Sequence, residues 1–273
     1  MTDNEFVTAY LGRLEVQPGA EPTLEYLRAL HCAHVNRVPF ENLSIHLGEP
    51  LSLEPDRLAE KVLERFRGGF CYELNGVFAR LLDLLGFQVT LMAARVWDGE
   101  AFGPPLDHLV LQVTTATEGI WLADVGFGDH SVYPIGWVTG LDQSEEGGTF
   151  RLEQQEGGDF DLYRNGSVQY RIETHPRTLG DFEGMCWYHQ TSPRSHFTRT
   201  LVCTRRRSEG RVTLSGRRLI TTTESGRTEE GLEGDRVVLN AYRVNFGIDL
   251  ERVPEVTPST GALSGPPFDD DRG

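Results

Sequence analysis

The sequence predicts an α+β fold, with a helical first third, a β-rich middle and a mixed last part. Up to residue 86, apolar residues recur at three- and four-residue spacings, which is typical of amphipathic helices. From residue 87 onward, short β-rich segments alternate with turn residues. With 273 residues, 38% of them hydrophobic, the chain can bury a substantial core in one large domain or in two or three small ones.

The first third is predicted to contain four helices. Pro22 with Thr23 is a helix start, and Gly86 is the glycine expected just after a helix end. The expected helices span Glu5–Leu14, Thr23–Val35, Leu58–Phe66 and Cys71–Leu85.

The middle third is predicted to form a β-barrel or a curled sheet. Asn165-Gly166 is a strong hairpin signal, because both residues tolerate the positive φ angles of a tight turn. The expected strands span Val89–Val96, Leu109–Thr114, Ile120–Val125, Phe150–Glu153, Phe160–Arg164 and Val168–Ile172.

The last part is predicted to contain three strands and one helix. These are Leu201–Arg205, Arg211–Ser215, Arg218–Thr222 and the helix Glu233–Tyr242. The stretch Pro254–Gly273 is rich in Pro, Gly, Ser and Asp and has little to bury, so we expect a tail or an arm along the surface.

Composition excludes several classes of partner. The net charge of −15 argues against nucleic acid, which needs a basic face. No run of eighteen apolar residues and no basic, then apolar, N-terminus occurs, so we expect a cytoplasmic protein that does not enter a membrane. Four cysteines without a CxxC pair suggest neither disulfides nor zinc, and His31 with His34 lack a clustered third ligand; no metal is expected.

Cys71 is the candidate nucleophile. It follows Gly68-Gly69-Phe70 and begins a predicted helix, where backbone N–H groups favour the thiolate and the glycines let a substrate come close. The competing interpretation is a buried cysteine in a helix-capping turn.

His108 and Asp124 are the candidate partners of that thiol. A thiol nucleophile needs a base, and the base needs a carboxylate or amide that fixes its tautomer. His108 precedes one predicted strand and Asp124 ends another, just before Gly126-Phe127-Gly128. Neighbouring strands could hold them together, with Cys71 delivered by the helix, in the papain-like or transglutaminase-like order Cys, His, Asp.

Four blocks of the chain resemble the arylamine N-acetyltransferases. In order they are Arg37–Leu43 (RVPFENL), Arg67–Asn75 (RGGFCYELN), Asp107–Leu111 (DHLVL) with Trp121–Gly128 (WLADVGFG), and Thr191–Phe197 (TSPRSHF). The resemblance implies three parts: a helical bundle at 1–86, a β-barrel at 87–187, and an α/β lid with the C-terminal tail at 188–273.

The resemblance also implies the site. The triad is Cys71, His108 and Asp124. An acceptor pocket is lined by Phe40, Phe70, Asp107 and Phe127, whose aromatic rings suit an aromatic amine. Contacts with CoA map onto Tyr188, Arg194 and Phe197. Glu41 and Arg67 correspond to a structural ion pair that ties the bundle to the cysteine turn; solvated surface charges are the alternative.

The implied activity is N-acetylation of arylamines and aryl hydrazines. Acetyl-CoA is a substrate rather than a permanently bound cofactor, and the acetyl group passes through an acetyl-Cys71 thioester in a ping-pong mechanism. Alternatives are a macrolactam-forming amide synthase of the same fold, a cysteine protease or transglutaminase-like enzyme, and a non-catalytic binding module. The preferred amine, the acyl-CoA range and homodimerisation stay open.

Overall fold

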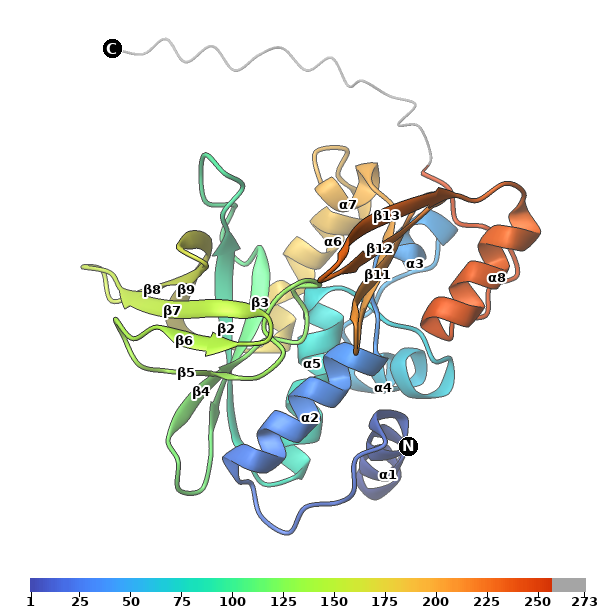
Figure 1. Cartoon of the computed structure of the whole chain (residues 1–273). Coiled ribbons are helices and arrows are strands. Elements are labelled where there is room, and N and C mark those ends of the chain that lie inside the picture. Colours follow the sequence, from blue (N-terminus) through green and yellow to red (C-terminus); the bar gives the residue numbers. More distant parts are fainter. Residues whose placement is uncertain (257–273) are drawn as a thin grey trace.

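A layer of helices covers one face of a strongly curved sheet, and a second, smaller sheet lies beside both (Figure 1). The computed structural model describes residues 1–256. The helices of the first part are α1 (Asp3–Leu14), α2 (Leu24–Arg37), α3 (Leu43–Leu47), α4 (Pro55–Ala59), the π-helical turn η1 (Glu60–Glu64) and α5 (Cys71–Leu84).

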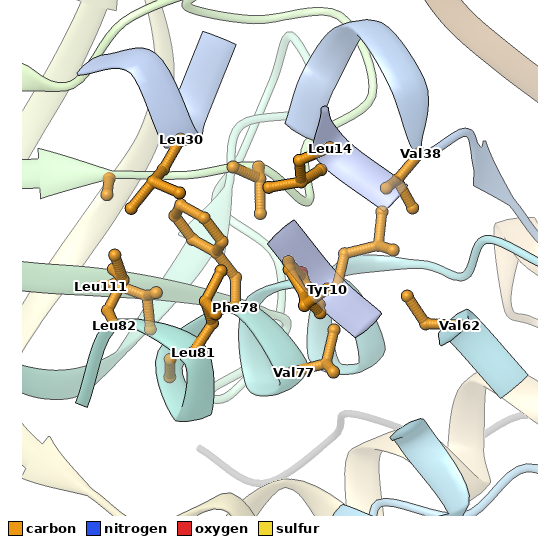
Figure 2. Packing of buried hydrophobic residues seen from close by; sticks show 14 of the residues in the cluster. Tyr10, Leu14, Leu30, Val38, Val62, Val77, Phe78, Leu81, Leu82 and Leu111 are labelled. Carbon is orange, nitrogen blue, oxygen red and sulfur yellow. The ribbon is translucent and has the colours of Figure 1, made fainter. Parts of the chain in front are cut away.

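Helix α5 is the centre of the first core. Its Phe78 and the side chains around it pack against Tyr10 of α1, Leu30 of α2 and Val62 of η1 (Figure 2). Leu111, from the barrel, belongs to the same cluster. The buried stripe of α5 therefore lies across the sheet, as the spacing of its apolar residues predicts.

The eight-stranded sheet is antiparallel throughout, in the order β5-β4-β3-β2-β9-β8-β7-β6. Its two edge strands meet, because the Gln143 side chain of β6 both donates to and accepts from the backbone of Gly136 in β5. The sheet is therefore a nearly closed barrel. Its strands are β2 (Gln88–Val96), β3 (His108–Thr114), β4 (Ile120–Ala123), β5 (Ile135–Gly136), β6 (Gln143–Glu145), β7 (Gly148–Gln154), β8 (Phe160–Arg164) and β9 (Ser167–Arg177).

Side chains of β3 and β4 alternate between two cores. Leu111 and Ala123 join the helical core, whereas Val110 and Leu122 face the barrel interior. His108 lies two residues before Val110 and Asp124 two residues after Leu122, so the alternation directs both side chains toward the barrel side.

The five-stranded sheet has the order β1-β10-β11-β12-β13 and is called the C-terminal sheet below. Its first strand, β1 (Phe40–Glu41), comes from the first part of the chain and pairs with Cys203 and Thr204. The other elements of this region are η2 (Leu179–Phe182), α6 (Glu183–Thr191), α7 (His196–Arg199), β10 (Val202–Arg207), β11 (Gly210–Ser215), β12 (Arg218–Thr223), β13 (Gly226–Gly231) and α8 (Asp235–Phe246), which packs on the sheet.

The α+β fold class is confirmed, and most element bounds agree within a few residues. The predicted helix over Leu58–Phe66 is instead α4 followed by a π-helical turn. The predicted hairpin at Asn165-Gly166 joins β8 to β9, and both turn residues have positive φ. Of the predicted tail, residues 257–273 lie outside the described part.

The division at residues 86 and 187 stays a prediction. Two elements bridge the proposed parts, since β1 adds to the C-terminal sheet and α6 runs across residue 187. Within residues 1–256, no helix is both long and apolar enough to span a membrane.

Candidate active site

His108 and Asp124 lie side by side because their strands are antiparallel neighbours. Leu111 of β3 pairs with Ala123 of β4, so the start of β3 and the end of β4 meet at one edge of the barrel. His108 Nε2 is 2.8 Å from Asp124 Oδ2, and both residues are 2% exposed. The spatial pairing that the sequence predicted is present.

Both carboxylate oxygens of Asp124 accept hydrogen bonds. Besides His108, the Tyr170 hydroxyl donates to Oδ2 (3.1 Å), while Asn75 Nδ2 (2.9 Å) and the Gly126 N–H (3.0 Å) donate to Oδ1. Burial alone raises the pKa of Asp124, but the His108 ring and these donors outweigh it and hold the pKa well below its usual range. The ionised carboxylate accepts from Nε2–H, which leaves Nδ1 of His108 as the nitrogen that can take a proton.

Cys71 is the first residue of α5 and is 3% exposed. Burial raises the pKa of its thiol well above the ordinary value, although a backbone hydrogen bond from Leu109 opposes the shift. The expectation that the helix N-terminus favours the thiolate stays a prediction.

Two glycines allow the cysteine turn to pack closely. A Cβ on Gly68 would lie 1.8 Å from the Pro39 carbonyl oxygen. A Cβ on Gly126, in the loop after Asp124, would lie 2.8 Å from the Cα of Cys71. The backbone of the loop after Asp124 therefore touches the start of α5 directly.

Glu73 fixes the same turn from the other side. Its Oε2 accepts from the N–H of Phe70 (3.2 Å), which caps α5, and its Oε1 pairs with the Lys61 ammonium at 2.7 Å. The Glu73 side chain is 1% exposed and that of Lys61 11%, so the ion pair is almost fully enclosed beside the cysteine turn.

Arg67 and Glu41 form a second enclosed ion pair. Arg67 Nε and Nη2 donate to the two carboxylate oxygens of Glu41 at 2.9 and 3.2 Å. Burial raises the pKa of Glu41, but the charges of Arg67 and Lys61 prevail and lower it to about 2. The buried pair implied by the resemblance is confirmed, and the surface-charge alternative is wrong.

Aromatic rings surround the cysteine and the histidine in two groups. On the cysteine side, Phe197 lies 6.1 Å from Phe40 and 5.3 Å from Phe70 between ring centroids. On the histidine side, the rings of Phe127 and His108 form a T-shaped pair with centroids 5.2 Å apart. The three predicted acceptor-pocket phenylalanines thus lie around Cys71 and His108.

The chain is similar in sequence to enzymes that transfer acetyl groups. A family model described as N-acetyltransferase matches residues 23–255. The arylamine N-acetyltransferase of Mycobacterium tuberculosis is 34% identical over 91% of each chain. The "arylamine N-acetyltransferase / N-hydroxyarylamine O-acetyltransferase" of Salmonella typhimurium is 36% identical over 77% of this chain and 76% of the relative.

The chain belongs to the arylamine N-acetyltransferase family. Solved structures agree: the Mycobacterium smegmatis arylamine N-acetyltransferase superposes with a TM-score of 0.82 at 34% identity, covering 89% of this chain and 92% of that one. A Mycobacterium marinum arylamine N-acetyltransferase in complex with CoA gives 0.81 at 34% identity, with the same coverage. The protein is therefore an acyltransferase.

The candidate CoA contacts lie in the α6–α7 region. Phe197, in α7, reaches the aromatic group beside Cys71. Tyr188 lies in α6 and its ring is 5.5 Å from that of His189, whereas Arg194 is exposed between the two helices. These three stay predictions, as does Asp107, which precedes His108.

Several residues at the site escaped the sequence analysis. Asn75 follows Cys71 by one helical turn, a spacing that could have pointed to it. Tyr170 comes from β9, which no spacing connects to Asp124. His31 accepts from the Asp124 N–H and its Nδ1 is 2.9 Å from the Val132 carbonyl oxygen, so both nitrogens are engaged and neither is free for a metal.

Proposed function

We propose that the protein acetylates arylamines and aryl hydrazines by a ping-pong mechanism, with acetyl-Cys71 as the intermediate. The observation that carries the proposal is the buried His108–Asp124 pair at the strand edge next to the N-terminus of the Cys71 helix. Membership of the family supports acetyl-CoA as the donor.

The first half-reaction begins with proton transfer from Cys71 to His108. Because burial disfavours a lone thiolate, the charge on sulfur forms together with an imidazolium that the Asp124 carboxylate stabilises. The thiolate adds to the thioester carbonyl of acetyl-CoA and the carbon–sulfur bond to CoA breaks. His108 returns its proton to the departing CoA sulfur.

The carbonyl oxygen needs hydrogen-bond donors as it becomes negative. The N–H groups of Cys71 and Tyr72 open the first turn of α5, and no acceptor in residues 1–256 occupies them. We assign them as the oxyanion donors, since first-turn amides have no partner within the helix.

In the second half-reaction the amine nitrogen adds to the acetyl-Cys71 carbonyl. His108 takes a proton from that nitrogen and gives it to the departing Cys71 sulfur, which restores the thiol as the amide product forms. Phe40, Phe70 and Phe127 contact the acceptor ring, and Asp107 lies at its polar side. The surrounding rings favour a flat aromatic acceptor.

The donor enters past the α6–α7 region. Tyr188 and Phe197 contact the body of CoA, and Arg194, whose side chain is exposed, meets a phosphate. The arginine is the one cation among the three candidates, so it is the one suited to a CoA phosphate.

The test is isolation of the intermediate. Incubation with acetyl-CoA alone should add one acetyl group to Cys71, detected by mass spectrometry of the peptide, and addition of 4-aminobenzamide should remove it and yield the amide. Initial rates should give parallel double-reciprocal lines. Cys203, a buried cysteine of β10, gives a matched control: Cys203→Ser should still label, whereas Cys71→Ser should not form the thioester. Intersecting lines with an unlabelled thiol would contradict the mechanism.

A further inference from the structure

His189 is a buried histidine beside the cysteine turn. It lies in α6 and is 6% exposed. Its Nδ1 is 3.1 Å from the Ser195 hydroxyl oxygen, which itself accepts from the Phe197 N–H, so the serine hydrogen is free to donate to Nδ1. The remaining nitrogen, Nε2, is buried without a hydrogen-bond partner. Burying a polar atom without a partner costs free energy, which indicates that a bound ligand or a nearby charge interacts with this nitrogen.

The carboxylate of Asp107 lies close to that nitrogen. Asp107 Oδ1 is 3.5 Å from His189 Nε2, and the Asp107 side chain is 16% exposed. The other oxygen, Oδ2, accepts from the N–H of Val96. The carboxylate is therefore held by backbone on one side and faces the histidine on the other, with part of its surface open.

This pair lies against the reacting thiol. The His189 ring is 6.3 Å from Phe70 and 6.0 Å from Tyr72 between centroids, and these two residues flank Cys71. After burial and the Leu109 hydrogen bond, the negative charge of Asp107 is the next cause that raises the pKa of Cys71, ahead of Asp124. Any molecule that reaches the thiol comes within range of the Asp107 charge.

We propose that Asp107 and His189 determine which acceptors are admitted according to their charge. The Asp107 carboxylate disfavours arylamines that carry a carboxylate, and His189, which can donate a hydrogen bond from Nε2, offsets that repulsion. The pair does not affect the admission of neutral arylamines. The inference rests on the acetyl transfer to arylamines proposed above and adds the charge class of the preferred acceptor.

The two side chains should shift selectivity in opposite directions. Asp107→Asn removes the negative charge, keeps an oxygen for the Val96 N–H, and leaves Nε2 of His189 free to donate to a substrate carboxylate. His189→Leu leaves the Asp107 charge without its partner. Like charges several Å apart near a protein surface change binding on the order of tenfold. A purely structural role would lower activity with both acceptors and leave their ratio unchanged.

The experiment measures kcat/KM for 4-aminobenzoate relative to 4-aminobenzamide, which differ in charge and have almost the same shape. Asp107→Asn should raise the ratio about tenfold, and His189→Leu should lower it. Asp142→Asn removes the same charge from an exposed loop of the barrel, where the side chain is 67% exposed, and should leave the ratio as in the wild type. Each ratio comes from one protein sample, so partial unfolding cancels.

A change with Asp107→Asn no larger than that with Asp142→Asn overturns the inference, as does a shift in the same direction for both site variants. If Asp107→Asn does not fold, His189→Leu tests the inference alone, and a ratio equal to that of the wild type overturns it. If the wild type acetylates neither amine, the proposed function is contradicted together with this inference. If it acetylates them and the kcat/KM ratio is the same in the site variants, only this inference is contradicted.

Discussion

Arg67 and Glu41 are joined by two hydrogen bonds in the interior, and their side chains are 2% and 0% exposed. Removing one partner leaves the other charge buried and unpaired. Arg67→Ala should therefore lower the free energy of unfolding by about 3–5 kcal/mol, measured by urea denaturation.

The exposed pair Arg37–Glu15 is the matched control. Its side chains are 39% and 68% exposed, so Arg37→Ala should change the same free energy by less than about 1 kcal/mol. Equal effects of the two substitutions would contradict the buried-pair interpretation.

Buried neutral histidines predict a loss of stability in mild acid. Burial lowers the pKa of His31 to about 4 and that of His130 to about 3. The unfolded chain binds these protons near pH 6.5. The contribution of the neutral histidines to the free energy of unfolding is therefore fully present above that pH, and it is lost as the pH drops toward their pKa values in the folded protein. His130→Gln should make the fall between pH 6.5 and 4 shallower by about 1.4 kcal/mol per pH unit, in denaturation series at stepped pH.

The exposed His175 provides the comparison, since it lies at the surface of β9 and His175→Gln should leave the slope unchanged. A wild-type free energy that stays constant from pH 7 to 4 would rule out the explanation.

Asp124→Asn should abolish most turnover while preserving the fold. An amide can present its NH₂ to His108 Nε2 and so favour the wrong tautomer of the ring. In a Ser-His-Asp triad the same change costs on the order of 10⁴-fold in kcat, and we expect 10³- to 10⁴-fold here. The assay is CoA release with an arylamine at saturating acetyl-CoA.

Asp161→Asn is the control for a buried acid outside the site. Asp161 of β8 is 4% exposed and pairs with Arg171 of the neighbouring strand β9, so its loss should affect stability rather than kcat. A comparable loss of kcat in both variants would mean that Asp124 acts only through the fold.

Gly126→Ala should impair catalysis by displacing the cysteine turn. The added carbon would lie 2.8 Å from the Cys71 Cα and 3.0 Å from its carbonyl oxygen, so backbone has to move. A displacement of about 1 Å at a reacting group can cost on the order of 10²-fold in rate, which steady-state kcat/KM would detect. A Cβ on Gly157 would have no atom within 4 Å, so Gly157→Ala should keep the wild-type kcat/KM. Equal kcat/KM values for the two variants would refute the close contact at Gly126.

Local patterns in the sequence were enough for the helices and strands with strong periodicity. The spacing of Leu74, Phe78 and Leu82 predicts α5, and the strands that hold His108 and Asp124 have clear apolar runs. Those elements hold the three members of the candidate triad, so local patterns were enough to propose them. The exposed polar strand β13, with no buried residue, has no such signal.

The contacts made between distant segments could not be predicted in the same way. Strand β1 has two residues, and its place depends on a partner more than 160 positions later. The pairing of Asp107 with His189 depends on where α6 crosses the barrel edge, which no local pattern encodes. The raised pKa of Cys71 likewise follows from burial by neighbours that the helix start does not specify.

The pairing of β1 with β10 cannot form until the later strand has been synthesised. During synthesis, Phe40 and Glu41 leave the ribosome more than 160 residues before their partners, Cys203 and Thr204. Until then β1 has no neighbouring strand, and its unpaired backbone groups can form hydrogen bonds with other chains. Strand β1, which also bridges to Gly69 of the cysteine turn, thus gains its neighbouring strand only after β10 has been synthesised.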